Sequence, residues 1–229
     1  MVPAALLERE AGAMPAAQAE CMPLSAALTD RQTGGVKTRT ARSDTQLDTQ
    51  LAHYAVTALI EEAQLTPKPA LVDRRGSGAH RDLDLPTMLR SARTLEPTFA
   101  ALARTARQRG EPSALLRAEL AQIGRAGERD MLAATRGSNA HRGAIWIVGL
   151  LVAGASMSST ATRVSAPKIC TLAAQIACFP DRFAAPTDSH GERARQRYQV
   201  GGARREAQDG FPHVIEIGLP ALHTARANG

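Results

Sequence analysis

Apolar residues recur at every third or fourth position along most of this chain, which is the spacing of helices that bury one face. One such face begins at Leu47 and continues through Leu51 and Leu59, and another runs over residues 85–95. No segment shows the alternation of polar and apolar residues that is typical of a half-buried strand. The pattern therefore predicts an all-α fold, a multi-helix globular domain with long substrate-binding loops between its helices.

Caps and prolines predict where these helices begin. Ser43 and Gln46 have the spacing of a capping box, so order is expected to start near Ser43. Pro97 should kink a helix or begin one, and Pro112 fits the first turn of another. Further helices are expected over 144–157, over 166–178 and, as two short pieces divided at 210–212, over 203–226.

The first part of the chain differs from the rest. Residues 1–43 lack a sustained helical period and are rich in Ala, Thr, Arg and Gly, so we expect a flexible N-terminal extension there. Residues 44–229 are expected to form the helical domain.

The composition favours helices and an anionic ligand. Alanine and leucine dominate, and both have high helix propensity. The net charge of +6 suits a nucleotide, a coenzyme A derivative or nucleic acid, although a solvated basic surface is the commoner cause of such a charge. Nucleic acid is disfavoured, because aromatic residues that stack on bases make up only 3% and the arginines are interleaved with acids.

Three features of the sequence indicate the cellular compartment in which the protein is expected. The three cysteines lack metal-like spacing and favour a reducing environment over a disulfide framework. The N-terminus carries early acidic residues and does not resemble a signal peptide. The uncharged stretch over 143–158 is too short for a membrane span, so a buried helix is expected there. We therefore expect a cytoplasmic protein with no membrane partner.

Charged residues gather in the loop over 65–82. Gly76 and Gly78 would let backbone amides approach a phosphate, and carboxylates in the same loop are ligands that Mg²⁺ accepts. A glycine-containing loop is a weak signal by itself, and the density of charge is what favours a functional site. The candidates are Lys68, Asp73, Arg74, His80 and Asp82.

A second polar loop, over 135–143, directly precedes the buried helix. Asn139, His141 and Arg142 lie where a helix N-terminus attracts anions, so Asn139 and Arg142 are candidate phosphate-binding residues. The alternative is that Asn139 or His141 only caps the helix.

Two glutamates lie on otherwise apolar helix faces. Glu62 follows Leu59 by three residues, so it is either paired or used for chemistry, or it marks a frayed helix end. Glu128 shares a face with Gly124 and Met131, where glycine permits close approach of a ligand or of another helix. Glu128 is therefore a candidate site residue or a surface residue beside a tight helix crossing.

The stretch over 187–206 is the last polar region with candidate residues. It combines Asp188, His190, Glu192 and Glu206 with several arginines, among them Arg204. Such a run is usually a solvated face, but its glycines also fit a phosphate-binding loop.

Three blocks of this sequence resemble the signatures of the triphosphoribosyl-dephospho-coenzyme A synthases. They are TPKPALVDRRGSGAHRDL (66–83), GERDMLAATRGSNAHRGAIW (127–146) and GGARREAQDGFPHV (201–214), in family order. The similarity covers roughly residues 47–223. RRGSGAHRDL, together with DSHGERARQRY (188–198), is most similar to the branch that serves malonate decarboxylase, and the citrate lyase branch is the runner-up.

The resemblance implies a helical fold and a specific transfer. The 5-triphosphoribosyl group of ATP would move to 3'-dephospho-CoA with release of adenine, and Mg²⁺ is expected with ATP. The product would be the prosthetic-group precursor for the malonate decarboxylase acyl-carrier subunit. A downstream prosthetic-group transferase and the acyl-carrier protein are therefore possible partners. A degenerate member that binds nucleotide or acyl carrier without catalysis is the alternative.

In this reaction, charged residues of the three blocks are expected to bind the triphosphate. Asp73 and Asp82 are expected to hold Mg²⁺ and position the phosphates. Lys68, Arg74 and Arg204 are expected to neutralise phosphate charge.

The remaining candidates are assigned to the sugar and to proton transfer. Breaking the glycosidic bond builds oxocarbenium character, which Glu128 or Glu206 would stabilise. His80 or His141 would move protons, and Glu62 is a further candidate.

The chain departs from the family pattern at several loop positions. Ala70, Arg136 and Arg205 stand where glycine is expected. Further departures are found at Ser138, Ala140 and Gln199, and the usual end of the family is expected beyond Gly229.

Overall fold

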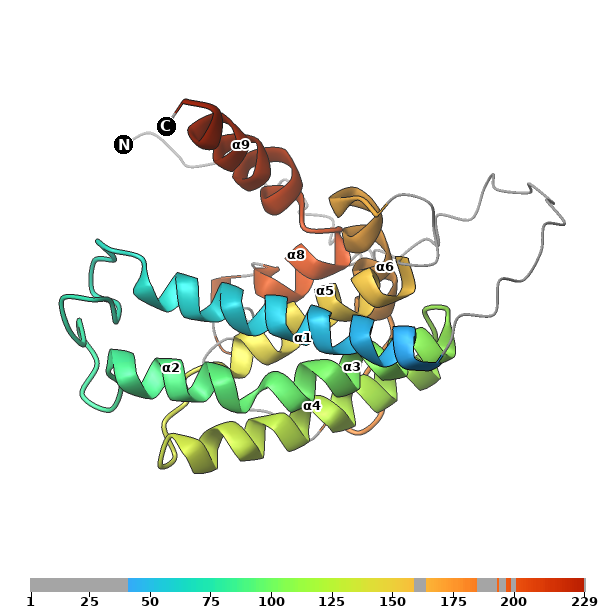
Figure 1. Ribbon diagram of the computed structural model, residues 1–229, viewed down its shortest axis with the longest axis horizontal. Helices are drawn as coiled ribbons and strands as arrows, with labels where there is room; N and C mark the ends of the chain where they lie inside the picture. The colour runs from blue at the N-terminus through green and yellow to red at the C-terminus, as the bar shows by residue number, and fades with distance from the viewer. Residues whose placement is uncertain (1–40, 159–163, 185–192, 194–196, 199–200, 229) are drawn as a thin grey trace, which may run out of the picture.

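A computed structural model of the chain describes residues 41–158, 164–184, 193, 197–198 and 201–228 (Figure 1). The expected flexible extension over 1–43 therefore lies almost entirely outside the described residues. The same is true of Asp188, His190, Glu192 and Gln199.

The first half of the chain forms four helices, two of which begin at a capping side chain. They are α1 (Ala41–Gln64), α2 (Leu85–Thr94), α3 (Glu96–Arg109) and α4 (Ala114–Ala134). Asp84 caps α2 by accepting a hydrogen bond from the Thr87 amide at 2.8 Å, and Ser113 caps α4 by accepting one from the Leu116 amide at 3.2 Å.

Two predicted helix starts were wrong by one or two residues. Helix α1 begins at Ala41, so Ser43 lies inside the helix and is not its cap. Pro112 precedes α4 and does not lie in its first turn, because the Ser113 side chain supplies the cap. Pro97 does lie in the first turn of α3, as the sequence predicts.

The second half of the chain completes the bundle. It contributes α5 (Arg142–Ser158), α6 (Ala166–Cys178), α8 (Gly202–Gln208), the π-helix η1 (His213–Gly218) and α9 (Leu219–Asn228). The predicted division at 210–212 is confirmed. Helix α9 extends from η1 at the edge of the bundle and buries none of its residues (Figure 1).

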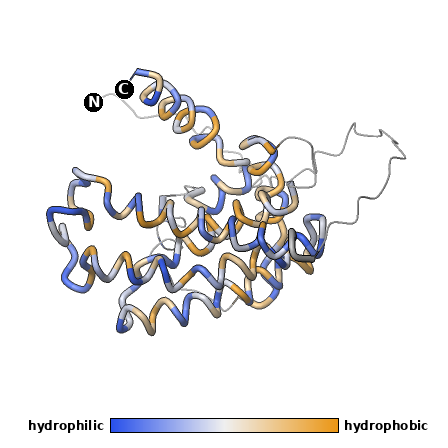
Figure 2. Tube along the Cα trace, in the orientation of Figure 1, coloured by the Kyte–Doolittle hydropathy of each residue, from blue (hydrophilic) through white to orange (hydrophobic). Residues whose placement is uncertain are grey.

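The core forms where α3 packs against α1, α4 and α5, and where α5 packs against α6. Phe99, Leu116, Met131 and Ile176 are fully buried there, and hydropathy colouring shows apolar positions along the packed helices (Figure 2). At Gly127 an added Cβ would lie 2.5 Å from the Thr98 side chain, so this glycine allows α4 to approach α3 closely.

The predicted all-α class is confirmed. The described part of the chain contains one isolated backbone bridge, between Asp73 and Gly76, and no strand. Among the same residues, no helix is both long enough and apolar enough to cross a membrane.

Candidate functional site

Two of the three sequence blocks come together at one end of the bundle. The loop between α1 and α2 and the loop between α4 and α5 lie at the same end (Figure 1). Two hydrogen bonds join these parts of the chain: Arg90 Nε donates to the Ala134 carbonyl at 2.7 Å, and Ser138 Oγ donates to the Asp82 carbonyl at 3.0 Å. Predicted site residues that are far apart in sequence are therefore neighbours.

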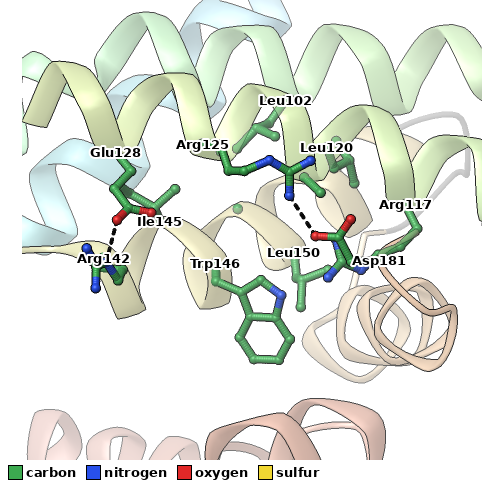
Figure 3. Close-up of a pocket in the computed structure, with 13 residues that line it drawn as sticks. Leu102, Arg117, Leu120, Arg125, Glu128, Arg142, Ile145, Trp146, Leu150 and Asp181 are labelled. Carbon is green, nitrogen blue, oxygen red and sulfur yellow. Dashed lines mark hydrogen bonds and ion pairs between the residues drawn. The ribbon is translucent and has the colours of Figure 1, made fainter. Parts of the chain in front are cut away.

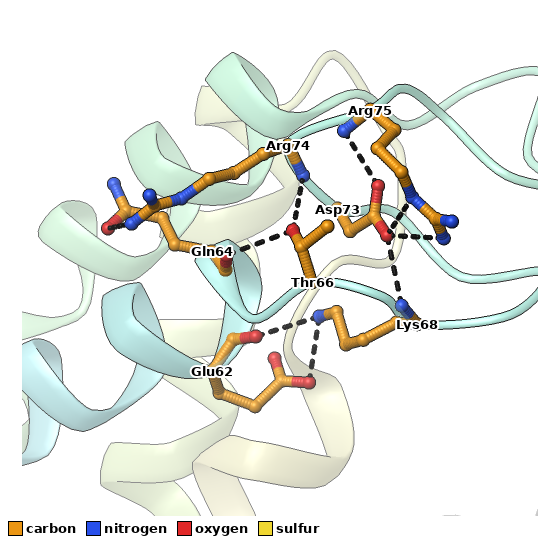
Figure 4. Close-up of polar contacts among 7 residues, drawn as sticks. All are labelled: Glu62, Gln64, Thr66, Lys68, Asp73, Arg74 and Arg75. Carbon is orange, nitrogen blue, oxygen red and sulfur yellow. Dashed lines mark hydrogen bonds and ion pairs between the residues drawn. The ribbon is translucent and has the colours of Figure 1, made fainter.

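Asp73 organises the first of these loops (Figure 4). Its side chain is only 2% exposed. One carboxylate oxygen accepts hydrogen bonds from the Lys68 amide and from Arg75 Nε, each at 2.9 Å, and the other accepts one from the Arg75 amide at 2.7 Å. These donors hold the pKa of Asp73 well below its usual range, and the Arg75 side chain has the largest effect.

The cations of this loop also have partners within the protein. Lys68 Nζ donates to the Glu62 carboxylate at 3.0 Å and to the Glu62 carbonyl at 2.8 Å, so Glu62 is paired and ties the loop to the end of α1 (Figure 4). The exposed Arg74 donates to Gln64 Oε1 at 3.4 Å, which leaves most of its donors open to a ligand.

Asp73→Asn is expected to loosen this loop. The ionised form of Asp73 is favoured in the folded state, so its stabilising effect is present above its ordinary pKa and is lost as the pH falls through the lowered folded-state value. Limited proteolysis at neutral pH should cleave residues 65–84 of the variant faster than those of the parent. Asp82→Asn is the control, because Asp82 is exposed. Equal cleavage of parent and Asp73→Asn would contradict this role.

The donor set does not fit a protein-held magnesium ion at Asp73. Mg²⁺ needs open carboxylate oxygens, and both oxygens of Asp73 already accept hydrogen bonds from the loop. No cluster of three or more potential metal-ligating side chains occurs within the described ranges. Asp82 faces solvent, 3.8 Å from His80 Nδ1. We therefore derive no step from a metal that the protein itself holds.

His141, in the loop between α4 and α5, is buried against α2. Its Nδ1 lies 2.7 Å from Ser91 Oγ of α2, and its Nε2 is buried and has no hydrogen-bond partner among the described residues. Burial lowers the pKa of His141 below its usual value, and the charges of Glu62 and Lys68 act on it in opposite directions. Burial thus favours the neutral imidazole, whose Nε2 can form one more hydrogen bond. Ser91 carried no recognisable signal in the sequence.

Asn139 performs the capping role that the sequence left open. Its side-chain oxygen accepts a hydrogen bond from the Arg142 amide at 3.2 Å, at the start of α5. Asn139 and His80 are otherwise exposed.

Glu128 lines a pocket between α4 and α5 (Figure 3). Its carboxylate lies 2.5 Å from Arg142 Nε, and its side chain is 27% exposed. Glu128 is therefore part of a concave surface that continues from the 135–143 loop. Gly124 also lines this pocket, whereas Gly127 packs against α3.

Further along, the pocket is lined by residues that sequence reasoning missed. Arg125 Nη1 donates to Asp181 Oδ2 at 2.7 Å, with Arg117 and Trp146 nearby (Figure 3). The helical spacing of Arg117 and Arg125 relative to Glu128 places the three on one face of α4, and this signal was present in the sequence.

The third sequence block forms α8 and η1. Glu206 accepts a hydrogen bond from the His213 amide at 3.0 Å, and its other oxygen lies 2.7 Å from His213 Nδ1. Arg204 is exposed, and its charge acts on Arg117.

Comparison with known proteins agrees with these motifs. The family model described as ATP:dephospho-CoA triphosphoribosyl transferase matches residues 48–229. The chain belongs to this triphosphoribosyl transferase family. Probable 2-(5''-triphosphoribosyl)-3'-dephosphocoenzyme-A synthases of Azotobacter vinelandii and Pseudomonas aeruginosa are 54% and 52% identical over 79% and 78% of this chain. The synthase of Klebsiella pneumoniae is 51% identical over 78% of it.

These matches cover part of each relative. The chain spans 61%, 60% and 63% of the three synthases, in the same order. No solved structure matches this chain.

The structure explains why glycine is expected at two of the positions where this chain departs from the triphosphoribosyl transferase pattern. Ala70 and Arg136 have φ angles of 63° and 56°, which is the left-handed region that favours glycine. Arg205 instead lies inside α8, where its Nε is 2.7 Å from Asp209 Oδ2. The backbone conformation therefore favours glycine at Arg136 and not at Arg205.

Arg136→Gly is expected to stabilise the fold by about 1 kcal/mol, because it relieves a left-handed backbone. Arg205→Gly should cost about 1 kcal/mol, because glycine weakens a helix interior. Urea unfolding of the two single variants measures both effects. Shifts of the same sign would show that the backbone conformations do not decide the outcome.

Proposed function

We propose that this chain transfers the 5-triphosphoribosyl group of ATP to 3'-dephospho-CoA and releases adenine. The observation that most supports this proposal is the family match over residues 48–229. The hydrogen bond from Ser138 to the Asp82 carbonyl, which joins the first two motif loops at one end of the bundle, adds to it, because reacting groups must converge.

In the proposed reaction a ribose hydroxyl of dephospho-CoA attacks C1' of ATP. The bond from C1' to the adenine nitrogen breaks, the hydroxyl proton passes to a base, and adenine takes up a proton as it leaves. Positive charge builds on the sugar in the transition state. Glu128 is the carboxylate we assign to that charge, because it lines the pocket next to the 135–143 loop. Glu206 is the alternative and is already paired with His213.

We assign proton transfer to His141. Its Nε2 has no hydrogen-bond partner among the described residues, and burial favours the neutral imidazole, which is the form that can accept a proton. The Ser91 hydroxyl orients the ring through Nδ1. His80, the other candidate, is exposed and less constrained.

We assign neutralisation of the phosphate charge to the basic residues at the rim of the two loops and in α8. Arg74 and Arg204 are exposed and have donors open to a ligand. Lys68 would have to exchange its Glu62 partner for phosphate. Asn139 and Arg142 contribute at the start of α5. When Mg²⁺ is bound with ATP, it supplies further neutralisation of the triphosphate.

We place the product in the malonate decarboxylase system, as the precursor of the prosthetic group of its acyl-carrier subunit. The RRGSGAHRDL motif supports this branch. Citrate lyase is the alternative. Modification of each purified acyl-carrier subunit, in the presence of a prosthetic-group transferase and the product of this chain, discriminates between the two branches.

Mass spectrometry of the purified chain with ATP and dephospho-CoA tests the reaction. Triphosphoribosyl-dephospho-CoA and free adenine should appear in equal amounts. Binding of both substrates without adenine release would instead identify a non-catalytic member of the family.

ATP with magnesium should raise the melting temperature of the chain, since a ligand that binds only the folded state stabilises it. The expected gain is roughly 2.7 kcal/mol at 100 times Kd. Differential scanning fluorimetry with and without dephospho-CoA measures the shift. No shift at saturating ATP would count against both the enzyme and the nucleotide-binding alternative.

A further inference from the structure

The pocket between α4 and α5 contains more positive charge than its own residues neutralise. Arg125 is paired with Asp181, whose other oxygen accepts a hydrogen bond from the Phe183 amide at 3.1 Å. Arg117 lies beside this pair, and its Nε is buried with no hydrogen-bond partner in the described part of the chain (Figure 3). Burial lowers the pKa of Arg117, which reflects the cost of keeping its charge there.

The charges that act on Arg117 are unbalanced. Those identified among the described residues are one carboxylate, Asp181, and two further guanidiniums, Arg125 and Arg204. A partly buried guanidinium without a full counter-charge is unfavourable, and the single carboxylate of Asp181 cannot neutralise both Arg117 and Arg125. An anion bound at this position would remove the imbalance. The planar donor set of arginine suits phosphate oxygens.

The pocket also offers an aromatic surface. The indole of Trp146 lines it from α5, opposite the arginines of α4 (Figure 3). Gly149 and Leu102 are both in its wall, and a Cβ added at Gly149 would lie 2.9 Å from the Leu102 side chain, so α5 and α3 pack closely there. Its volume of about 170 Å³ is smaller than the roughly 300 Å³ at which pockets for whole ligands begin. The pocket therefore suits one end of a larger molecule.

We propose that this pocket binds a di- or triphosphate chain, with Arg117 and Arg125 on the phosphate oxygens and Trp146 against the adjoining part of the ligand. This proposal rests on the proposed function only for the identity of the molecules that carry the phosphate groups, which are ATP and dephospho-CoA. Phosphate binding by the pocket itself needs neither substrate.

Titration calorimetry on the full chain tests this site with inorganic pyrophosphate as the probe. Arg117→Met keeps an unbranched stem and removes the guanidinium with all of its donors. Its affinity for pyrophosphate should fall at least about 10-fold, as expected for hydrogen bonds to a charged group. Arg109→Met is the matched control, because Arg109 pairs with Glu119 outside this pocket. Parental affinity in Arg117→Met, or no pyrophosphate binding by the parent, would overturn the proposal.

ATP and dephospho-CoA, titrated separately, identify the source of the phosphates. The substrate that loses affinity in Arg117→Met is the one that occupies the pocket, and no loss with either would overturn the proposal. Trp146→Leu should weaken the binding of that substrate and leave the affinity for pyrophosphate unchanged. If Arg117→Met does not fold, Arg125→Met tests for the same loss of pyrophosphate affinity. Failure of the parent to release adenine would refute the proposed function and leave the pyrophosphate result intact, so the two failures are distinguishable.

Discussion

Glu128→Gln is expected to lower turnover about 100-fold or more and to leave ATP affinity nearly unchanged. The substitution keeps the shape of the side chain and removes the charge that is assigned to the sugar cation. A group that acts mainly in the transition state lowers turnover without a matching loss of ground-state binding. Adenine release and ATP titration on one preparation measure both quantities.

Glu119→Gln is the matched control. Glu119 lies on the same helix, pairs with an arginine as Glu128 does, and is 28% exposed against 27% for Glu128, but it lies outside the α4–α5 pocket. It should behave like the parent. Near-parental turnover in Glu128→Gln would remove Glu128 from the reaction. A parallel loss of turnover and ATP affinity would show that it positions the nucleotide.

The second large effect is expected for Asp48→Ala, which should destabilise the fold by about 3–5 kcal/mol. Asp48 is 1% exposed on α1, and its two oxygens accept hydrogen bonds from Arg107 of α3 at 3.1 and 2.8 Å. Removing the carboxylate leaves the mostly buried guanidinium of Arg107 without its main partner. Urea unfolding gives the free energy directly.

The Glu119→Gln variant also serves as a control for stability. Its partner Arg109 is considerably exposed, so the loss of this surface pair should cost no more than about 1 kcal/mol. Similar costs for Asp48→Ala and Glu119→Gln would contradict the importance assigned to the buried pair.

Much of the secondary structure could be predicted because its signals are local. The apolar spacing from Leu47 to Leu59 and the proline at 97 act within a few residues, and α1 and α3 formed where these signals indicated. The motif blocks likewise identified the family, since each is a continuous run of sequence.

The roles of single charged residues were harder to predict. Asp73 has the residue type and loop position of a metal ligand, but the loop folds back so that backbone and arginine donors surround its carboxylate. The fold of that loop brings Lys68 and Arg75 to the Asp73 side chain, and this tertiary arrangement is what the sequence did not reveal.

The sequence by itself determined the helices, their approximate limits and the family. Only the tertiary structure decided which side chains meet: Glu128 with Arg142, Ser91 with His141, and Asp48 with Arg107. It also left Arg117 partly buried beside a single carboxylate. The physical reason is that helix formation depends on neighbours a few positions away. These pairs form between different helices or loops, whose relative positions are set by the packing of the whole core.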